Sequence, residues 1–316
     1  MIFLCLAFLQ INNGRSNYRV GRSEIDTNAS RRNDRLRGPF PPSQISMPEA
    51  VLNYATYKNS NYNWMLGRFI VPLGRLPEFS ESAREFTSPE ARKPWRISVV
   101  AGEDIVDTIR QIQDFNHHNA PAVVCDVVEL KASTGSKIEN TVGVLPGDIT
   151  AYFELPLIDD LDDLVSALAF TGQRAKIRTG GVTSDAFPTS REIIRFVRTC
   201  LAANVPFKAT AGLHHPIRCF APLTYAADSP KATMHGFLNL FIMVGFAREG
   251  FRTMVLEDLM EEEFEEVFEF DDGGVTWRDH RLTIEQLERT RLSGIISFGS
   301  CSFDEPIADL QEFGVL

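Results

Sequence analysis

Two lysines lie inside predicted strands, where an amino group can serve as a nucleophile. Lys176 belongs to the segment AKIRT (175–179) and Lys208 to VPFKATA (205–211), and glycines follow both. A charged amine buried in a strand is costly unless it is paired. A lysine beside a second cation and an apolar wall has a lowered pKa, and its neutral amine can attack a carbonyl group to form a Schiff base. We therefore predict Lys208 as the nucleophile and Lys176 as its electrostatic partner.

Other polar residues at predicted strand ends are candidates for proton transfer and for substrate binding. Glu154 closes a predicted strand and His214 follows the Lys208 strand, so we expect these two to act as acid and base. Backbone N–H groups in glycine-rich turns favour anions, which predicts a turn that clamps an anionic group. The residues predicted to bind substrate are Arg178, Thr179, Gly180, Gly181, Thr210, His215, Ser300 and Cys301.

Alternative interpretations of these residues remain open. Glu154 could pair with Lys176 in a salt-bridged layer that only fills the protein interior. A divalent metal at Glu154 and His214, with Asp126, is an alternative to a site without metal, although no H-x-H or H-E-x-x-H spacing occurs. Cys301 would be a nucleophile if its thiolate were stabilised, and is otherwise a small core residue. No cofactor is expected in the favoured interpretation.

The segments that carry these residues alternate between strand and helix, in units of about 25–30 residues, which predicts parallel β-α-β units. Polar residues at the carboxyl ends of such strands meet at one face. The fold class is therefore predicted to be α/β, a (β/α)8-barrel-like fold that is incomplete or irregular because one strand is missing or disguised. Strands are predicted at 68–72, 95–101, 122–130, 150–157, 175–179, 205–211 and 294–303, and helices at 103–116, 161–170, 190–203, 235–246 and 284–292.

The two ends of the chain give weaker patterns. We predict a disordered or poorly ordered N-terminal extension over residues 1–60, with Met47 as a plausible true start, and a single barrel-like domain over 61–316. The acidic run 261–266 is interpreted as a solvated helix face, and 268–282 as a hairpin that turns at its Asp-Asp-Gly-Gly segment.

Composition limits the possible partners. A net charge of -10 argues against nucleic acid or an anionic membrane as the main partner, and a small anionic substrate is expected instead. No stretch reaches the roughly 20 apolar residues that span a bilayer. The five cysteines form no C-x-x-C pair, which favours reduced thiols and a cytoplasmic location. A homo-oligomer is compatible with these observations.

Four blocks carry a resemblance to known proteins. AKIRTGGVTSDAFP, PFKATAGLHHP, HGFLNLF and FGSCSFDEP resemble a family of bacterial proteins that is uncharacterised. A narrower set of residues resembles deoxyribose-phosphate aldolases, class I aldolases on a (β/α)8 barrel. Lys208, Thr210 and Gly212 are similar to their Schiff-base motif Lys-x-Ser/Thr-x-Gly, and Lys176 precedes a Gly-Gly pair as their second lysine does, one residue further away. The two blocks stand in the opposite order along this chain.

These observations predict an enzyme that acts on a small phosphorylated or carboxylated carbonyl compound. It would be a lyase of the aldolase type or an isomerase, and the resemblance implies Lys208 as its Schiff-base lysine. One alternative is an anion-binding enzyme without a Schiff base, such as a phosphoribosyltransferase-like protein. A second alternative is a non-catalytic small-molecule-binding protein in which the charged strands are fully paired.

Overall fold

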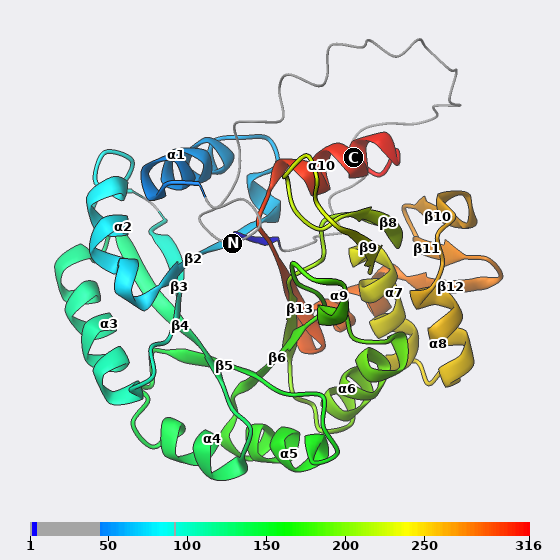
Figure 1. Ribbon diagram of the computed structural model, residues 1–316, viewed down its shortest axis with the longest axis horizontal. Helices are drawn as coiled ribbons and strands as arrows, with labels where there is room; N and C mark the ends of the chain where they lie inside the picture. Colours follow the sequence, from blue (N-terminus) through cyan, green and yellow to red (C-terminus); the bar gives the residue numbers. More distant parts are fainter. Residues whose placement is uncertain (1, 5–44, 92) are drawn as a thin grey trace.

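The computed structural model describes residues 2–4, 45–91 and 93–316. Seven parallel strands of this described chain form a barrel that is seen end-on in Figure 1, which confirms the predicted α/β barrel-like fold. Hydrogen bonds join neighbouring strands in the order β2, β3, β4, β5, β6, β7 and β13. Their bounds are β2 Leu66–Pro72, β3 Trp95–Val100, β4 Val123–Lys131, β5 Thr150–Glu154, β6 Arg174–Arg178, β7 Phe207–Thr210 and β13 Ile295–Ser300.

An antiparallel strand takes the eighth place in the barrel. β1 (Ile2–Leu4) pairs with β13, where Ile2 lies opposite Ser300, and with β2, where Ile2 lies opposite Phe69. The strand that the sequence pattern lacked therefore comes from the apolar N-terminal run. Residues 2–4 lie within the N-terminal stretch that was predicted as a poorly ordered extension, and in the structure they form this strand.

The folded part of the chain also begins before the predicted boundary at residue 60. Helix α1 (Met47–Lys58) starts where the Ser46 side chain accepts a hydrogen bond from the Glu49 backbone N–H. It buries Val51 and Tyr54, and the Tyr54 hydroxyl donates to the backbone carbonyl of Gly67 at the start of β2. Residues 45–60 thus belong to the barrel domain. The rest of the predicted extension, residues 1 and 5–44, lies outside the described residues.

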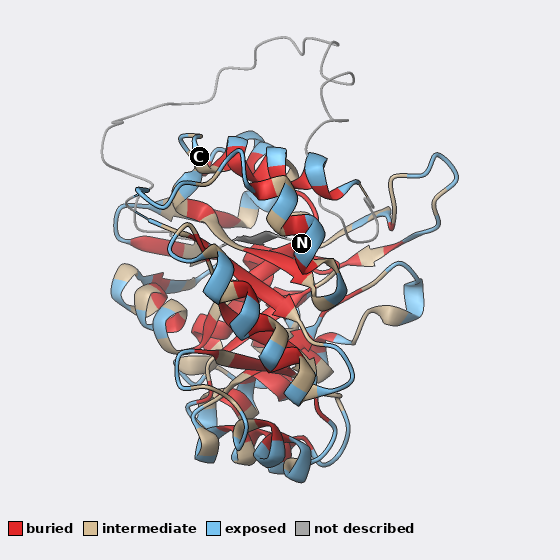
Figure 2. Ribbon diagram, turned by 90° about the vertical axis from the view of Figure 1, so that its left-hand side faces the viewer, coloured by how far each residue is buried: buried red, intermediate tan, exposed pale blue. Residues whose placement is uncertain are grey.

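Helices surround the barrel and cover its outer face (Figure 1). Because side chains alternate along a strand, one set points outward to the helices and the other into the lumen. The outward set is apolar and includes Ile97, Phe153 and Ile177, all fully buried in the main core. Figure 2 shows most of the barrel strands in red, the colour of buried residues. The helices that follow the strands are α2 Leu76–Ala83, α3 Ile105–Asn119, α4 Gly135–Val142, α5 Leu161–Thr171 and α6 Ser190–Ala202, with short 3₁₀ turns η3 Asn63–Met65, η4 Leu73–Arg75 and η5 Ser184–Ala186.

A long connection replaces the simple crossover between β7 and β13. It contains the hairpin of β8 (Cys219–Pro222) and β9 (Lys231–Met234), the buried helix α7 (Phe237–Arg248) and then α8 (Thr253–Met260). The predicted hairpin at 268–282 is part of a three-stranded antiparallel sheet. The remaining elements are β10 Phe268–Asp271, β11 Gly274–Trp277, β12 His280–Thr283, α9 Ile284–Ser293, α10 Asp304–Glu312 and η6 Glu265–Val267. No helix of the described residues is long and apolar enough to cross a membrane.

The acidic run 261–266 is not the solvated helix face that its charge predicted. Glu262 is only 3% exposed. Its carboxylate accepts hydrogen bonds from the Trp277 indole N–H at 3.3 Å and from the Arg278 guanidinium at 2.6 Å. The run therefore includes one buried acid that ties the α8 end to the three-stranded sheet.

Candidate active site

The lumen of the barrel is polar, because the inward-facing positions of several adjacent strands carry charged or hydroxyl side chains. Glu154 on β5 is the register partner of Lys176 on β6, and Lys176 is the register partner of Lys208 on β7. Partners in parallel strands point to the same face of the sheet. The structure thus places three of the four predicted catalytic residues side by side at one level of the barrel.

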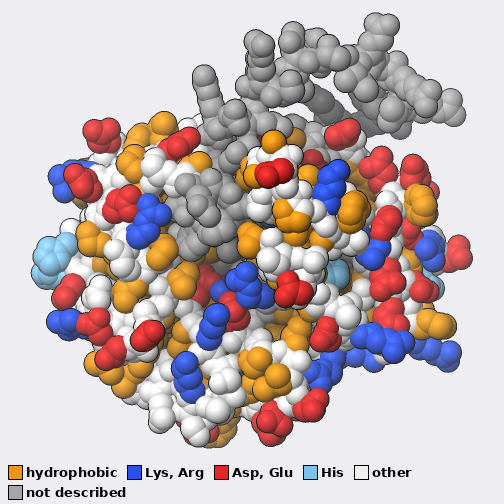
Figure 3. All heavy atoms as spheres, in the orientation of Figure 1, with side chains coloured by type: hydrophobic (Ala, Val, Ile, Leu, Met, Phe, Trp, Pro, Cys, Tyr) orange, Lys and Arg blue, Asp and Glu red, His pale blue; other side chains and the backbone are white. Residues whose placement is uncertain are grey.

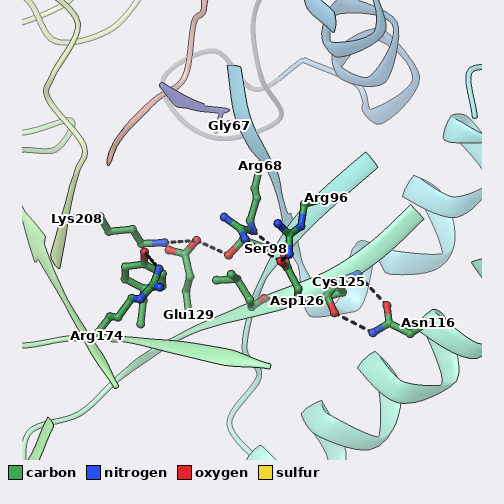
Figure 4. A network of polar contacts seen from close by, with 12 residues as sticks. Gly67, Arg68, Arg96, Ser98, Asn116, Cys125, Asp126, Glu129, Arg174 and Lys208 are labelled. Carbon is green, nitrogen blue, oxygen red and sulfur yellow. Dashed lines mark hydrogen bonds and ion pairs between the residues drawn. The ribbon is translucent and has the colours of Figure 1, made fainter. Parts of the chain in front are cut away.

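A buried carboxylate links the two lysines. Glu129 on β4 is 2% exposed, and its oxygens lie 2.8 Å from the Lys208 Nζ and 3.1 Å from the Lys176 Nζ. Ser98 on β3 donates to the same carboxylate at 2.7 Å, opposite Lys208 (Figure 4). Lys176 also lies 2.8 Å from Glu154. We call Glu129, Glu154, Lys176 and Lys208 the lysine–carboxylate network.

Sequence reasoning missed Glu129, the last but one residue of the predicted strand 122–130. The signal was present, since Glu129 lies two residues from Val127 and two from Lys131 and so shares their face of the strand. An acid at an inward position opposite two inward lysines is the partner that buried cations require.

The two lysines differ in protonation because the carboxylates are shared unequally. Burial lowers the pKa of Lys208 to about 7, and the Lys176 charge adds to this effect against the attraction of Glu129. Lys176 is also penalised by burial, but Glu129 and Glu154 together raise its pKa above the ordinary value. The two ammonium groups hold the pKa of Glu129 at about 2 despite its burial. The network therefore holds one lysine as a cation and allows the other to be neutral near pH 7.

Tyr152 provides the wall beside Lys208. The Lys208 Nζ lies 4.1 Å from the centre of the Tyr152 ring. Arg174 covers the same ring, with its guanidinium carbon 5.4 Å from the ring centre, and donates to the Tyr152 hydroxyl at 2.8 Å. Phe207 and Ala209, which flank Lys208 in the sequence, belong to the outer core. The apolar surface next to the amine is thus an aromatic ring of the lumen.

Cavities lie next to this network. A cavity of about 630 Å³ is lined by Glu129, Lys176 and Glu154, and an adjoining one of about 610 Å³ by Glu154 and the exposed Arg178. Lys131 and Lys137 line both. Figure 3 shows basic and acidic side chains next to one another at the centre of the face of the molecule that it displays. A third cavity, of about 260 Å³, is lined by Lys208 with Arg68 and Ser297, and it shares no lining residue with the two larger ones. The two larger volumes suit a small molecule.

In the predicted anion-binding turn, the polar side chains donate hydrogen bonds to backbone carbonyls near the ends of β6 and β7. The Arg178 guanidinium donates to the Gly180 carbonyl at 3.4 Å. A side chain at Gly180 would lie 2.9 Å from the Gly212 Cα, so the two glycines allow β6 and β7 to end in close contact. Thr179 donates a hydrogen bond to the Ala211 carbonyl, and Thr210 donates one to the Ile177 carbonyl. Gly181 packs beside Ala186.

The residues of the metal alternative lie among other partners. Asp126 receives two hydrogen bonds of 2.7 Å from Arg68 and also contacts Arg96 (Figure 4). Glu154 pairs with Lys176, and His214 with Glu305. Among residues 2–4, 45–91 and 93–316, no group of three or more His, Cys, Asp or Glu side chains is arranged to hold a metal ion.

The last predicted residues gather at the carboxyl ends of β7 and β13. His214 contacts Cys301 and Glu305, and His215 contacts Asp309 at 2.7 Å. Ser300 is buried and accepts a hydrogen bond from the Ser302 backbone N–H. His214 was predicted as the acid or base of the lysine site, but its contacts here are to a thiol and a carboxylate.

The block HGFLNLF positions the two histidines. Asn239, fully buried in α7, accepts a hydrogen bond from the Arg218 backbone N–H, and the Phe237 backbone N–H donates to the His215 carbonyl. Gly236 lies so close that an added Cβ would be 2.4 Å from the Pro216 carbonyl oxygen. The start of α7 therefore fixes the loop that follows β7.

No protein-family model matches the sequence, and a comparison with curated proteins finds no relative. Fold and site together define an α/β-barrel protein whose lumen holds a lysine–carboxylate network beside open cavities. The resemblance of its sequence blocks to a bacterial family and to class I aldolases stays a prediction.

Proposed function

We propose that the protein is an enzyme that acts on a small carbonyl compound through a Schiff base on Lys208. The observation that carries this proposal is the fully buried Lys208, whose pKa is lowered to about 7 beside the cationic Lys176. An amine that is neutral near pH 7 attacks carbonyl carbons, whereas an ordinary lysine, with a pKa of about 10.4, is almost entirely protonated.

The neighbouring groups supply the proton transfers that imine formation requires. The neutral Lys208 Nζ adds to the carbonyl carbon, and the Lys176 ammonium donates a proton to the oxygen that becomes negative. Glu129, in contact with both amines, takes the proton that Lys208 loses. Glu129 then returns this proton to the new hydroxyl group, which leaves as water, and a protonated imine remains. That imine accepts the electron pair released when a neighbouring carbon–carbon or carbon–hydrogen bond breaks, as in lyases and isomerases.

Glu154 completes the acid–base set. It lies 2.8 Å from the Lys176 Nζ and lines both larger cavities, so it can return a proton to Lys176 between steps. The cationic groups Arg178, Lys131 and Lys137 line the 610 Å³ cavity next to it. We infer that they bind a phosphate or carboxylate carried by the substrate, since guanidinium and ammonium groups pair with such anions.

Borohydride trapping tests this proposal directly. The protein is incubated with a panel of small phosphorylated and carboxylated aldehydes and ketones, reduced with borohydride, digested and analysed by mass spectrometry. A reduced adduct is expected on Lys208. It should disappear in Lys208→Arg, which keeps the positive charge but loses imine chemistry, and persist in Lys231→Arg, whose lysine is exposed on β9.

Two results would count against the Schiff base. One is the absence of any adduct across the panel. The other is turnover of a substrate by Lys208→Arg at the wild-type rate, which would instead favour an anion-binding enzyme without a covalent step. Binding of panel compounds without any turnover would favour a non-catalytic binding protein.

A further inference from the structure

Four side chains that the proposed mechanism does not use meet beside the ends of β7 and β13. Cys301 directly follows β13, His214 follows β7, Tyr225 follows β8 and Glu305 belongs to α10. We call these four residues the thiol cluster. His214 and Tyr225 are far from Cys301 and Glu305 in the sequence, and the fold brings the two pairs together.

Within the thiol cluster, the imidazole of His214 contacts both Cys301 and Glu305. The Cys301 Sγ lies 3.7 Å from the His214 Nδ1 and 3.9 Å from the Nε2. The His214 Nδ1 also lies 3.2 Å from Glu305, and the Tyr225 hydroxyl donates to Glu305 at 2.7 Å. A proton on Nδ1 that is donated to Glu305 leaves Nε2 for exchange with the thiol.

Charge at this cluster favours a protonated imidazole. The His214 ring loses hydration by burial, but Cys301 and Glu305 outweigh this loss and raise its pKa to about 10. Burial acts to raise the pKa of Glu305, but His214, with Tyr225 and the more distant His215, outweighs it and lowers that pKa. On α10 the adjacent Asp304 accepts from the Tyr57 hydroxyl of α1. An imidazolium beside a sulfur stabilises the thiolate form.

The pKa values of the other described cysteines are all raised. Burial raises the pKa of Cys125 to about 12 and also raises that of Cys200. The pKa of the half-buried Cys219 is raised to about 11 by burial and by two nearby acids. All three are therefore thiols at neutral pH, and thiols are poor nucleophiles.

We propose that Cys301 and His214 form a thiolate–imidazolium pair that reduces small hydroperoxides, a second reactive centre separate from the lysine–carboxylate network. The thiolate sulfur attacks one peroxide oxygen, so an S–O bond forms while the O–O bond breaks. Hydroxide from hydrogen peroxide, or alkoxide from an organic hydroperoxide, leaves and takes the imidazolium proton of His214 to become water or an alcohol. The sulfur loses two electrons and becomes a sulfenic acid, and the peroxide gains two.

The burial of Cys301 selects this class of electrophile. The residue is only 4% exposed, so a bulky acyl donor has little access to its sulfur, whereas a peroxide of two heavy atoms needs a very small opening. Susceptibility to peroxide depends on thiolate character and access. His214 contributes the proton that the leaving hydroxide needs, which an isolated thiolate lacks.

The test uses the whole protein treated with hydrogen peroxide in the presence of dimedone, which traps sulfenic acids, followed by peptide mass spectrometry. Cys301 should carry the adduct, at a rate roughly tenfold or more above that of Cys219, because the raised pKa of Cys219 keeps it a thiol at pH 7 and the thiolate is the nucleophile. Cys301→Ser should lose this adduct. His214→Gln should slow it roughly tenfold with the fold intact by circular dichroism.

A second measurement keeps the proposal testable if His214→Gln fails to fold. In the wild-type protein, labelling of Cys301 by iodoacetamide should be nearly constant from pH 6 to 8, whereas labelling of Cys219 rises through that range. Equal rates at the two cysteines, or a Cys301 rate that climbs with pH as Cys219 does, would overturn the proposal. Cys301 should be labelled in Lys208→Arg at the same rate as in the wild-type protein. The proposal for the thiol cluster can therefore be tested independently of the proposed Schiff base.

Discussion

Lys176 and Lys208 are register partners on adjacent strands, and the same buried carboxylate contacts both. Among the described residues, Glu129 is the carboxylate that contacts both amines. Lys176 has Glu154 as a second partner, and the Lys208 amine faces the Tyr152 ring. This uneven sharing is the physical origin of the lowered pKa of Lys208, because burial is compensated less for one lysine than for the other.

Replacing Glu129 with Gln should destabilise the fold. The change keeps the shape but removes the negative charge that two buried ammonium groups share, and breaking a buried ion pair costs about 3–5 kcal/mol. Urea unfolding should show a lower midpoint with an unchanged slope. Glu139→Gln, the same change on the exposed face of α4, serves as the control and should leave the midpoint unaltered. Equal midpoints for the two variants would show that the network contributes little to stability.

Schiff-base trapping should depend on pH through Lys208. Only the neutral amine reacts, and the pKa of Lys208 is lowered to about 7, so the rate should rise with pH through neutrality and level off above it. Lys176→Met removes a positive charge that lowers this pKa and leaves Glu129 to Lys208 alone. The midpoint of the pH–rate curve should therefore move to higher pH. A midpoint that stays in place, or moves down, would contradict the assigned role of Lys176.

The alternating strands and helices could be predicted because each is encoded by the spacing of apolar residues within its own segment. Segments such as 161–170 and 190–203 show helical spacing of apolar residues, and the strands between them are short apolar runs. β1 could not be predicted in this way. Three apolar residues near the N-terminus carry no periodicity, and only the open edges of β2 and β13 make them a strand.

The site was predicted in part for a similar reason. Strand alternation was enough to place Glu154, Lys176 and Lys208 on one face. The contact of His214 with Cys301 depends on where the loop after β7 meets the start of α10, and no local pattern encodes that meeting. Prediction at the level of single strands therefore found the lysines but merged two separate clusters into one site.

Glu262 offers a test of the corrected acidic run. Glu262→Ala should lower stability by about 1–3 kcal/mol, since it leaves the buried Trp277 indole N–H without an acceptor. Glu266→Ala removes an exposed acid four residues away and should change the urea midpoint very little. Similar losses in both variants would restore the view of the run as a uniform charged surface.

Gly236 should tolerate no side chain. An added Cβ would lie 2.0 Å from the Asn239 side-chain oxygen and 2.4 Å from the Pro216 carbonyl oxygen, so the loop that carries His214 must move. Overpacking of this kind costs about 1–3 kcal/mol. Gly236→Ala should therefore lower the urea midpoint and, in the folded protein, slow dimedone labelling of Cys301. Gly147→Ala is the matched control, because nothing lies within 4 Å of its added Cβ. If Gly236→Ala matched this control in both measurements, the start of α7 would have no part in holding the histidine loop.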